Sequence, residues 1–338
     1  MNTTFLLGNG FDVCLGLKTK YQQFYENHYA GLPKEGVSNA LKEFRKEIEG
    51  YVKGFLKKTD DDIDWADLEL ALGKYSEKLT RPEDYIEIIL DVNKELKNYI
   101  AKQNETLLLD EKKARKLLKD FCLPDSVDYI SLQDNSSLKL YKSNRRSSED
   151  IHFITFNYTE TLEKILSLGN SKSTFPNSGG YATTVKTITH IHSHLKDDPA
   201  IIVGVNDPSQ IANVKFRENE DVLDVIVKPR TNDMFGNGKN SQATNLLQTT
   251  DLFVVCGASL AETDKKWWSL IGKELVNKDC RLLYFVYENP GESNPLLLGN
   301  KRRKYIRKFM KTADISQNAY GNLQSKIIVA YNTNIFKL

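Results

Sequence analysis

Hydrophobic and polar positions along the chain follow two different patterns. Residues 3–7 form a short apolar run, which predicts a buried strand. From Leu15 to about Cys122, apolar residues instead recur at steps of three and four, as they do on one face of a helix. We predict helices within residues 38–58, 65–79, 82–100 and 105–121, with Ser38 and Pro82 at the starts of two of them. A helical bundle therefore follows the first strand.

Short apolar, β-branched and aromatic runs return after residue 150. The predicted strands are residues 151–157, 186–192, 200–205, 224–228, 252–257, 281–287 and 326–331, and helical patterns separate some of them at 160–167, 264–276 and 302–313. Strands that are apolar throughout and alternate with helices are typical of a parallel sheet covered on both faces. We predict an α/β fold with a mainly parallel sheet. Residues 1–14 and 150–338 form its domain, and residues 15–149 form a large all-helical insertion.

Two polar stretches, residues 169–184 and 230–242, are rich in Gly, Asn, Ser and Thr and predict loops. Loops of this length in a compact domain are often lids or binding elements.

Composition mainly excludes classes of protein. Of the 338 residues, 40% are hydrophobic and 27% charged, and the net charge is +2, so the whole molecule has no strong attraction for nucleic acid or membranes. Its cysteines form no Cys-x-x-Cys pair, which argues against a zinc site and a disulfide framework. No segment approaches about 20 continuous apolar residues, and the N-terminus has no signal-peptide pattern. We therefore expect a cytoplasmic protein that does not span a membrane.

The first predicted strand runs directly into Gly8-Asn9-Gly10, with Asp12 shortly after. Asn-Gly between apolar residues is a strong hairpin signal, but residues 11–29 are a poor second strand. The alternative is a strand, glycine turn and helix, which would place backbone N–H groups where phosphate groups bind. The two glycines would permit positive φ and close backbone approach. We favour the nucleotide loop, although Val13 stands where the dinucleotide fingerprint has its third glycine.

Three other predicted strands also end in polar groups. The strand 151–157 ends in Asn157 and is followed by Tyr158, the strand 186–192 ends in His192, and the strand 252–257 leads through Gly257 to Ser259. Because the carboxyl ends of parallel strands line one crevice, we expect these groups to converge on the glycine turn.

With these segments in place, the chain resembles the AbiH abortive-infection family of bacterial phage-defence proteins. The resemblance rests on "LLGNGFDVCLGLKTKYQQF", "DWADLE" (64–69), "FNYTETLE", "HIHSHL" with "IIVGVND" (201–207) and "GASLAETDKKWW". In "DWADLE", Trp65 and Glu69 lie one helical turn apart and either pack the bundle or face a ligand.

The chain is more distantly similar to the sirtuin-like NAD-binding folds. That similarity implies a Rossmann-like sheet, through the glycine loop, an Asn and a His after two strands, and a late Gly-x-Ser strand end. There are departures from the pattern: Gly-Asn-Gly replaces Gly-Ala-Gly, and Ser193 follows His192 where related domains often have glycine. The metal-binding cysteines of the deacylases are absent, which argues against protein deacylation.

The resemblance implies NAD as substrate, cut at the nicotinamide–ribose bond without a metal. Asn157 would orient water or ribose through its amide, and His192 would act as base, since imidazole titrates near neutrality. The implied nucleotide-binding residues are Gly8, Asn9, Gly10, Asp12, Tyr158, Gly257 and Ser259.

The histidines of "HIHSHL" allow a different interpretation. His190, His192 and His194 alternate along a predicted strand and would share one face, as in some metal sites. No cysteine or carboxylate stands at a supporting spacing, although Asp197 and Asp198 follow, and we expect no metal.

The basic run "KRRKYIRKFMK" (301–311) predicts an amphipathic helix whose charges either face solvent or contact RNA or DNA phosphates. Three functions therefore remain open: an NAD-consuming defence effector, which we favour, a nuclease-type toxin and a non-catalytic nucleotide sensor. A homo-oligomer and a phage-derived trigger are further partners that the resemblance leaves open.

Overall fold

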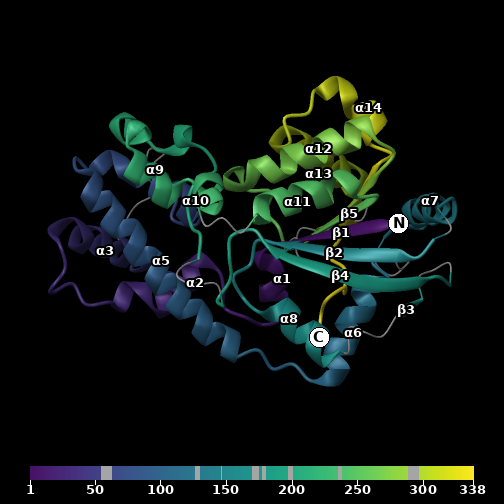
Figure 1. Ribbon diagram of the computed structural model, residues 1–338, viewed down its shortest axis with the longest axis horizontal. Coiled ribbons are helices and arrows are strands. Elements are labelled where there is room, and N and C mark those ends of the chain that lie inside the picture. The colour runs from purple at the N-terminus through teal and green to yellow at the C-terminus, as the bar shows by residue number, and fades with distance from the viewer. Residues whose placement is uncertain are drawn as a thin grey trace. The chain divides into compact units, whose positions relative to one another are not determined.

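The computed structural model describes residues 1–54, 63–125, 130–145, 147–169, 175–176, 180–196, 201–234, 238–287 and 297–338. The chain forms two compact units (Figure 1). The first comprises Met1–Leu15, Leu107–Ile191 and Ser241–Leu338, and the second comprises Gly16–Thr106 and His192–Asn240. Each unit is therefore assembled from segments that are distant in the sequence.

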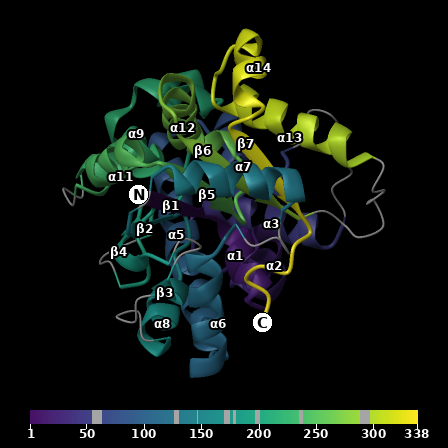
Figure 2. The same ribbon diagram turned by 90° about the vertical axis from the view of Figure 1, so that its right-hand side faces the viewer.

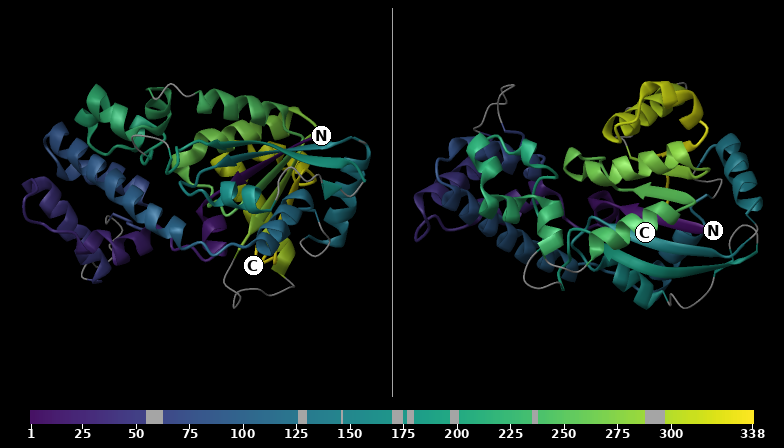
Figure 3. Two further views of the ribbon diagram at one scale, coloured as in Figure 1. Left: turned by 60° about the horizontal axis from the view of Figure 1, so that its bottom comes forward. Right: turned by 45° about the horizontal axis from the view of Figure 1, so that its top comes forward.

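The first unit is built on a seven-stranded sheet of order β3-β4-β2-β1-β5-β6-β7, whose strands run side by side in Figure 3. The parallel strands are β1 (Asn2–Leu7), β2 (Glu149–Thr155), β4 (Ala182–His190), β5 (Leu252–Cys256), β6 (Arg281–Val286) and β7 (Ile327–Tyr331). The two-residue β3 (Phe175–Pro176) pairs antiparallel with β4 at one edge. The predicted α/β fold is confirmed, and the hairpin alternative for the first strand is wrong, because β1 pairs in parallel with β2 and β5.

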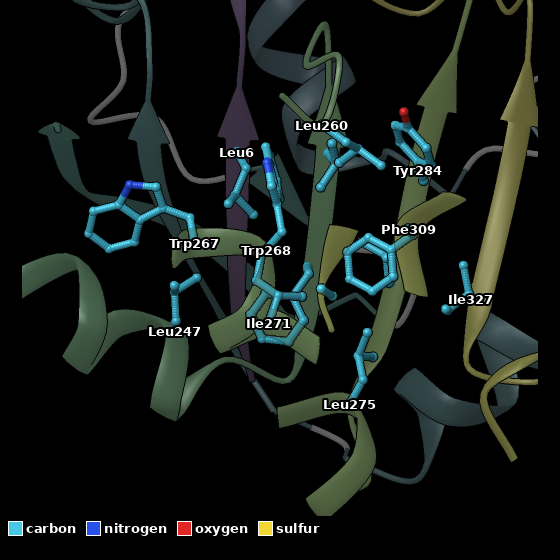
Figure 4. Packing of buried hydrophobic residues seen from close by; sticks show 14 of the residues in the cluster. Leu6, Leu247, Leu260, Trp267, Trp268, Ile271, Leu275, Tyr284, Phe309 and Ile327 are labelled. Atoms are coloured by element: carbon cyan, nitrogen blue, oxygen red, sulfur yellow. The ribbon is translucent and has the colours of Figure 1, made fainter. Parts of the chain in front are cut away.

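Helices cover both faces of this sheet. One face carries α11 (Lys239–Thr249), α12 (Lys265–Asn277), α13 (Leu298–Thr312) and α14 (Tyr320–Leu323). Figure 4 shows Trp268, Ile271 and Phe309 of this layer packed over the strands. The opposite face carries α1 (Asn9–Cys14), α6 (Glu111–Cys122), α7 (Leu132–Ser143) and α8 (Thr161–Leu168), of which α6 and α8 lie side by side in Figure 1 and Figure 2. Each face of the sheet thus has its own core.

The second unit is helical in its described residues. Its α-helices are α2 (Tyr21–Asn27), α3 (Asn39–Val52), α4 (Leu68–Tyr75), α5 (Pro82–Glu105), α9 (Glu220–Ile226) and α10 (Lys228–Met234). The Ser38 hydroxyl caps α3 by accepting a hydrogen bond from the Leu41 N–H, and Pro82 occupies the first turn of α5, as predicted. The helical insertion after the first strand is thereby confirmed. Among the described helices, none is both long enough and apolar enough to cross a membrane.

The two units do not follow the predicted boundaries throughout. Helices α6 and α7 belong to the first unit, because Leu117, Phe121 and Leu138 pack into the core on one face of the sheet. Residues 192–240 belong to the second unit. Amphipathic helices do not reveal in their sequence which surface they cover, so the boundaries depended on tertiary packing.

Two predicted strands in residues 192–240 are wrong. Residues 201–204 form no strand, and Val205 makes only a single bridge to Val227. Residues 224–228 lie at the end of α9 and the start of α10. Short apolar runs also occur in buried helices and coils, so their composition alone cannot distinguish these alternatives.

The predicted loop 230–242 is also wrong in its described part, because α10 and α11 occupy most of it. Much of the other predicted loop, 169–184, lies outside the described residues, as do residues 197–200.

Candidate functional site

The order of the strands reverses direction beside β1. From β1 the chain builds outward through β2 and β4 on one side, then returns to build β5, β6 and β7 on the other. Phe11, which follows β1, packs into the core on one face of the sheet, whereas Trp268, which follows β5, packs into the core on the other. Ligands of open α/β sheets bind outside the carboxyl ends of the strands at such a switch point. The residues that we predicted at the strand ends of the first unit lie at this switch point.

Gly8 and Gly10 bring two backbone turns into direct contact. The Gly8 N–H donates to Cys256 O at 3.0 Å, and the Gly10 N–H donates to Gly257 O at 2.8 Å. A Cβ on Gly8 would lie 2.6 Å from Ala258 Cα, and one on Gly10 would lie 2.7 Å from Gly257 Cα. The atoms that approach these glycines closely belong to the protein's own backbone, and the predicted approach of a ligand stays a prediction. Neither Gly8 nor Gly10 has a positive φ, so that part of the prediction is wrong.

The second turn, after β5, requires unusual backbone conformations. Gly257 has a φ of +69°, and a Cβ there would lie 2.2 Å from the Phe11 nitrogen, so no other residue fits without rearrangement. Leu260 has a φ of +59°, which is uncommon for a bulky residue. Its side chain is buried next to Trp268 and Tyr284 in Figure 4. The carbonyl of Ser259, between them, accepts a hydrogen bond from Lys308 Nζ at 3.0 Å.

A buried polar cluster joins the ends of β1 and β2. The Thr159 hydroxyl donates to Asp12 Oδ2 at 2.7 Å, the Thr161 hydroxyl donates to Thr159 Oγ1 at 3.0 Å, and Asn157 Nδ2 donates to Gly8 O at 3.2 Å. Asp12 is 1% exposed and Asn157 is 7% exposed. Among the described residues, no group donates to Asp12 Oδ1 or Asn157 Oδ1. Two acceptor oxygens are thus without a donor from the described residues.

The pKa of Asp12 follows from this burial. Loss of hydration raises its pKa from 3.8 to about 6, although the Thr159 hydroxyl and the nearby His190 favour the ionised form. The carboxyl therefore changes charge just below neutral pH.

His190, the last residue of β4, connects the third strand end to the cluster. Its Nδ1 lies 3.0 Å from the Asn157 carbonyl oxygen, and its Nε2 lies 2.8 Å from Glu163 Oε1 on α8. The His190 ring thus links the end of β2 to α8. Because β4 ends at His190, the predicted sharing of one strand face by His190, His192 and His194 is wrong.

His192 begins the segment of the second unit, where it is buried and its carbonyl accepts a hydrogen bond from the Ile202 N–H at 2.9 Å. Ser193 has a φ of +63°, a conformation that glycine adopts readily and serine seldom does. A glycine at this position would adopt the same conformation without strain. The predicted role of His192 as a base stays a prediction.

Comparison with known protein families places these features in context. Residues 4–286 match the family model described as "Bacteriophage abortive infection AbiH". The chain belongs to the AbiH family. The match includes the glycine turn, the Asn157 and His190 strand ends and the turn at Gly257, so the predicted resemblance is confirmed. No curated protein matches the chain. Membership of AbiH supports a role in abortive infection against phage.

Two of the AbiH-like motifs meet inside the second unit. Glu69 of "DWADLE" forms a buried ion pair with Lys228, 2.9 Å between Oε2 and Nζ, and its Oε1 lies 3.5 Å from the Gly204 N–H of "IIVGVND". Trp65 is buried among aromatic rings that include Phe44, 5.5 Å away between ring centroids. Both residues therefore pack the bundle, which decides the alternative left open by their spacing.

The sequence prediction missed Thr159, Thr161 and Glu163 and considered His190 only as a metal ligand. These residues stand at strand ends or in the first turn of α8, and that position was the one signal available. Of the other predicted residues, Asn9 starts the six-residue α1, and Tyr158 is buried beside Asn157 in sequence.

Proposed function

We propose that this AbiH protein binds NAD or a related nucleotide at the carboxyl end of its sheet and hydrolyses the nicotinamide–ribose bond. The observation that supports this is the meeting of Asp12, Asn157 and His190, from three strand ends, in one buried polar cluster. Buried polar atoms in proteins are nearly always hydrogen-bonded, so exceptions at a switch point suggest a ligand. Ribose hydroxyls are donors of the kind that Asp12 Oδ1 and Asn157 Oδ1 lack.

The proposed reaction makes modest demands on the protein. The bond between ribose C1′ and the nicotinamide nitrogen breaks, and nicotinamide leaves as a neutral molecule with the bonding electron pair. Water adds to the oxocarbenium-like C1′ and gives one proton to a base, which leaves ADP-ribose. Asn157 orients the ribose or the water, ionised Asp12 accepts a hydrogen bond from a ribose hydroxyl, and His192 is the base.

The test is the release of nicotinamide from NAD by purified protein. Asn157→Ala and His192→Ala should each slow turnover at least about 10²-fold, since a positioned base alone contributes roughly 10²–10⁴-fold. Asn318→Ala, an exposed position on the first unit, is the matched control and should retain wild-type turnover. Rates unchanged in both site variants would contradict the proposal, and nucleotide binding without turnover would favour a sensor.

In cells, we propose that NAD loss halts metabolism before the phage completes its cycle. Cells carrying the Asn157→Ala variant should then lose both phage protection and the fall in NAD after infection. Protection that persists at constant NAD would separate the defence role from this reaction.

One observation favours a second candidate, a toxin that acts on nucleic acid. The exposed side of α13 carries Lys304, Arg307, Lys308 and Lys311, and none of them pairs with a carboxylate among the described residues. Cleavage of RNA or DNA that stops when a chelator is added, with no loss of NAD, would support this candidate instead.

A further inference from the structure

The N–H groups of the two glycines in the glycine turn are not available to a nucleotide's phosphates. The N–H groups of Gly8 and Gly10 donate to the carbonyls of Cys256 and Gly257, which leaves them turned toward the protein. Helix α1, which starts at Asn9, has only six residues, too short for a strong helix dipole. The N–H groups of Gly8 and Gly10 therefore cannot balance the negative charge of a diphosphate at this switch point.

Lys308 places a cation at the turn after β5. Its ammonium group donates to the Ser259 carbonyl at 3.0 Å, and Ser259 belongs to the turn whose Gly257 contacts Gly10. An ammonium group has three N–H donors, so two remain for a ligand after the one used by Ser259. The contact with Ser259 fixes the head of a long, flexible side chain, which lowers the entropy cost of binding an anion.

Among the described residues, no carboxylate forms an ion pair with the basic neighbours Lys304 and Arg307 or with Lys308 itself. Lys304 stands one helical turn before it, and Arg307 lies with its guanidinium 5.4 Å from the centroid of the Tyr320 ring. Burial, followed by repulsion from Lys304, lowers the pKa of the Lys308 ammonium. A bound polyanion would reduce the repulsion between like charges that lie side by side.

We propose that Lys308 binds the diphosphate of the nucleotide taken by the strand-end cluster, an inference that rests on the proposed function. The ligand class is a dinucleotide or nucleoside diphosphate, and the cation is supplied by α13 rather than by the glycine turn. Lys308 would set affinity, not chemistry, because it contacts the turn after β5 and makes no hydrogen bond to Asp12 or Asn157.

The experiment compares a substrate that has the diphosphate with one that lacks it. Lys308→Gln should raise KM for NAD about tenfold and keep kcat within about twofold, since a charge-assisted hydrogen bond is worth roughly 1.5–3 kcal/mol and tenfold corresponds to 1.4 kcal/mol. Nicotinamide riboside, which has no phosphate, should be hydrolysed with unchanged KM. Lys308→Arg, which keeps the charge, should restore most of the affinity for NAD.

Lys273→Gln is the matched control, because it removes one exposed charge from the neighbouring α12 and should leave both substrates unaffected. An unchanged KM for NAD in Lys308→Gln would overturn the inference, as would an equal rise for both substrates, which indicates a merely structural role.

The binding of ADP-ribose, measured by calorimetry, separates this inference from the proposed reaction. If the wild-type protein hydrolyses neither substrate, the proposed function fails, yet tenfold weaker ADP-ribose binding by Lys308→Gln still supports a phosphate site. Equal affinity of wild type and variant, or no binding by the wild type, would overturn the phosphate site itself.

Discussion

Both ends of the sheet in the first unit contain buried carboxylates, but the partners of these carboxylates differ between the two ends. At the amino end, Lys142 Nζ lies 3.3 Å from Asp125 Oδ1 and 3.4 Å from Glu149 Oε2, and all three side chains are at most 8% exposed. Burial disfavours the ammonium form, yet the two carboxylates hold the pKa of Lys142 above its usual value. Here a buried cation supplies the counter-charge for two buried anions, although Asp125 Oδ2 and Glu149 Oε2 accept no hydrogen bond from the described residues.

At the carboxyl end, Asp12 has no lysine or arginine partner among the described residues of its unit. Its pKa is raised to about 6, and one of its oxygens accepts no hydrogen bond from the described residues. The two ends therefore differ in whether a buried carboxylate has a lysine partner in its own unit.

The largest expected effect comes from removing the cation at the amino end. Lys142→Met should lower the free energy of unfolding by about 3–5 kcal/mol, because Asp125 and Glu149 stay buried without a counter-charge. Urea unfolding at neutral pH measures this loss. Lys139→Met, an exposed position on the same helix, is the control and should change stability by less than about 0.5 kcal/mol. Similar small losses in both variants would remove the contrast between the two ends.

The second prediction concerns the carboxyl end and depends on pH. The folded state binds the Asp12 proton more tightly than the unfolded state, so the wild type loses stability as pH rises from about 4 to about 6. Asp12→Asn cannot lose that proton. Its stability relative to wild type should therefore increase by about 2 kcal/mol between pH 4 and pH 8, since one pKa unit corresponds to 1.36 kcal/mol and part of the effect is already present at pH 4.

Urea unfolding of both proteins at the two pH values measures the change. Asp221→Asn, at an exposed position, should differ from wild type by less than about 0.5 kcal/mol at either pH. A difference for Asp12→Asn that is the same at both pH values would show that Asp12 ionises normally in the folded protein. The variant should also hydrolyse less NAD under the proposed function, so stability and activity would move in opposite directions.

The smallest of the three effects concerns the backbone packing at the carboxyl end. Gly10→Ala should cost about 1–3 kcal/mol, because its Cβ would meet the backbone of Gly257, which cannot rotate away as a side chain would. Gly31→Ala, where nothing lies within 4 Å of an added Cβ, should change stability by less than about 1 kcal/mol. Thermal unfolding of the two variants measures this difference. Equal unfolding midpoints would mean that the turn at Gly10 can move away from the turn at Gly257 without a loss of stability.

Local pattern predicted most of the parallel strands, because strands covered on both faces are apolar throughout and short. It also predicted α3, α5, α6, α12 and α13, whose apolar residues repeat at the helical period. It failed at residues 201–205 and 224–228, where apolar runs of the same composition pack in the helical unit. Helix α7 was missed because residues 132–143 carry only a weak amphipathic pattern.

The amino-acid sequence by itself determined that polar residues stand after β1, β2, β4 and β5, because strand ends are local features and parallel strands share one edge. It thereby identified Asp12 and Asn157 as members of one region. Only the tertiary structure decided which groups they meet: the Thr159 hydroxyl, the His190 ring and the carbonyl of Gly8. The reason is physical, since hydrogen-bond direction, burial and the pKa of a carboxyl depend on neighbours from distant parts of the chain.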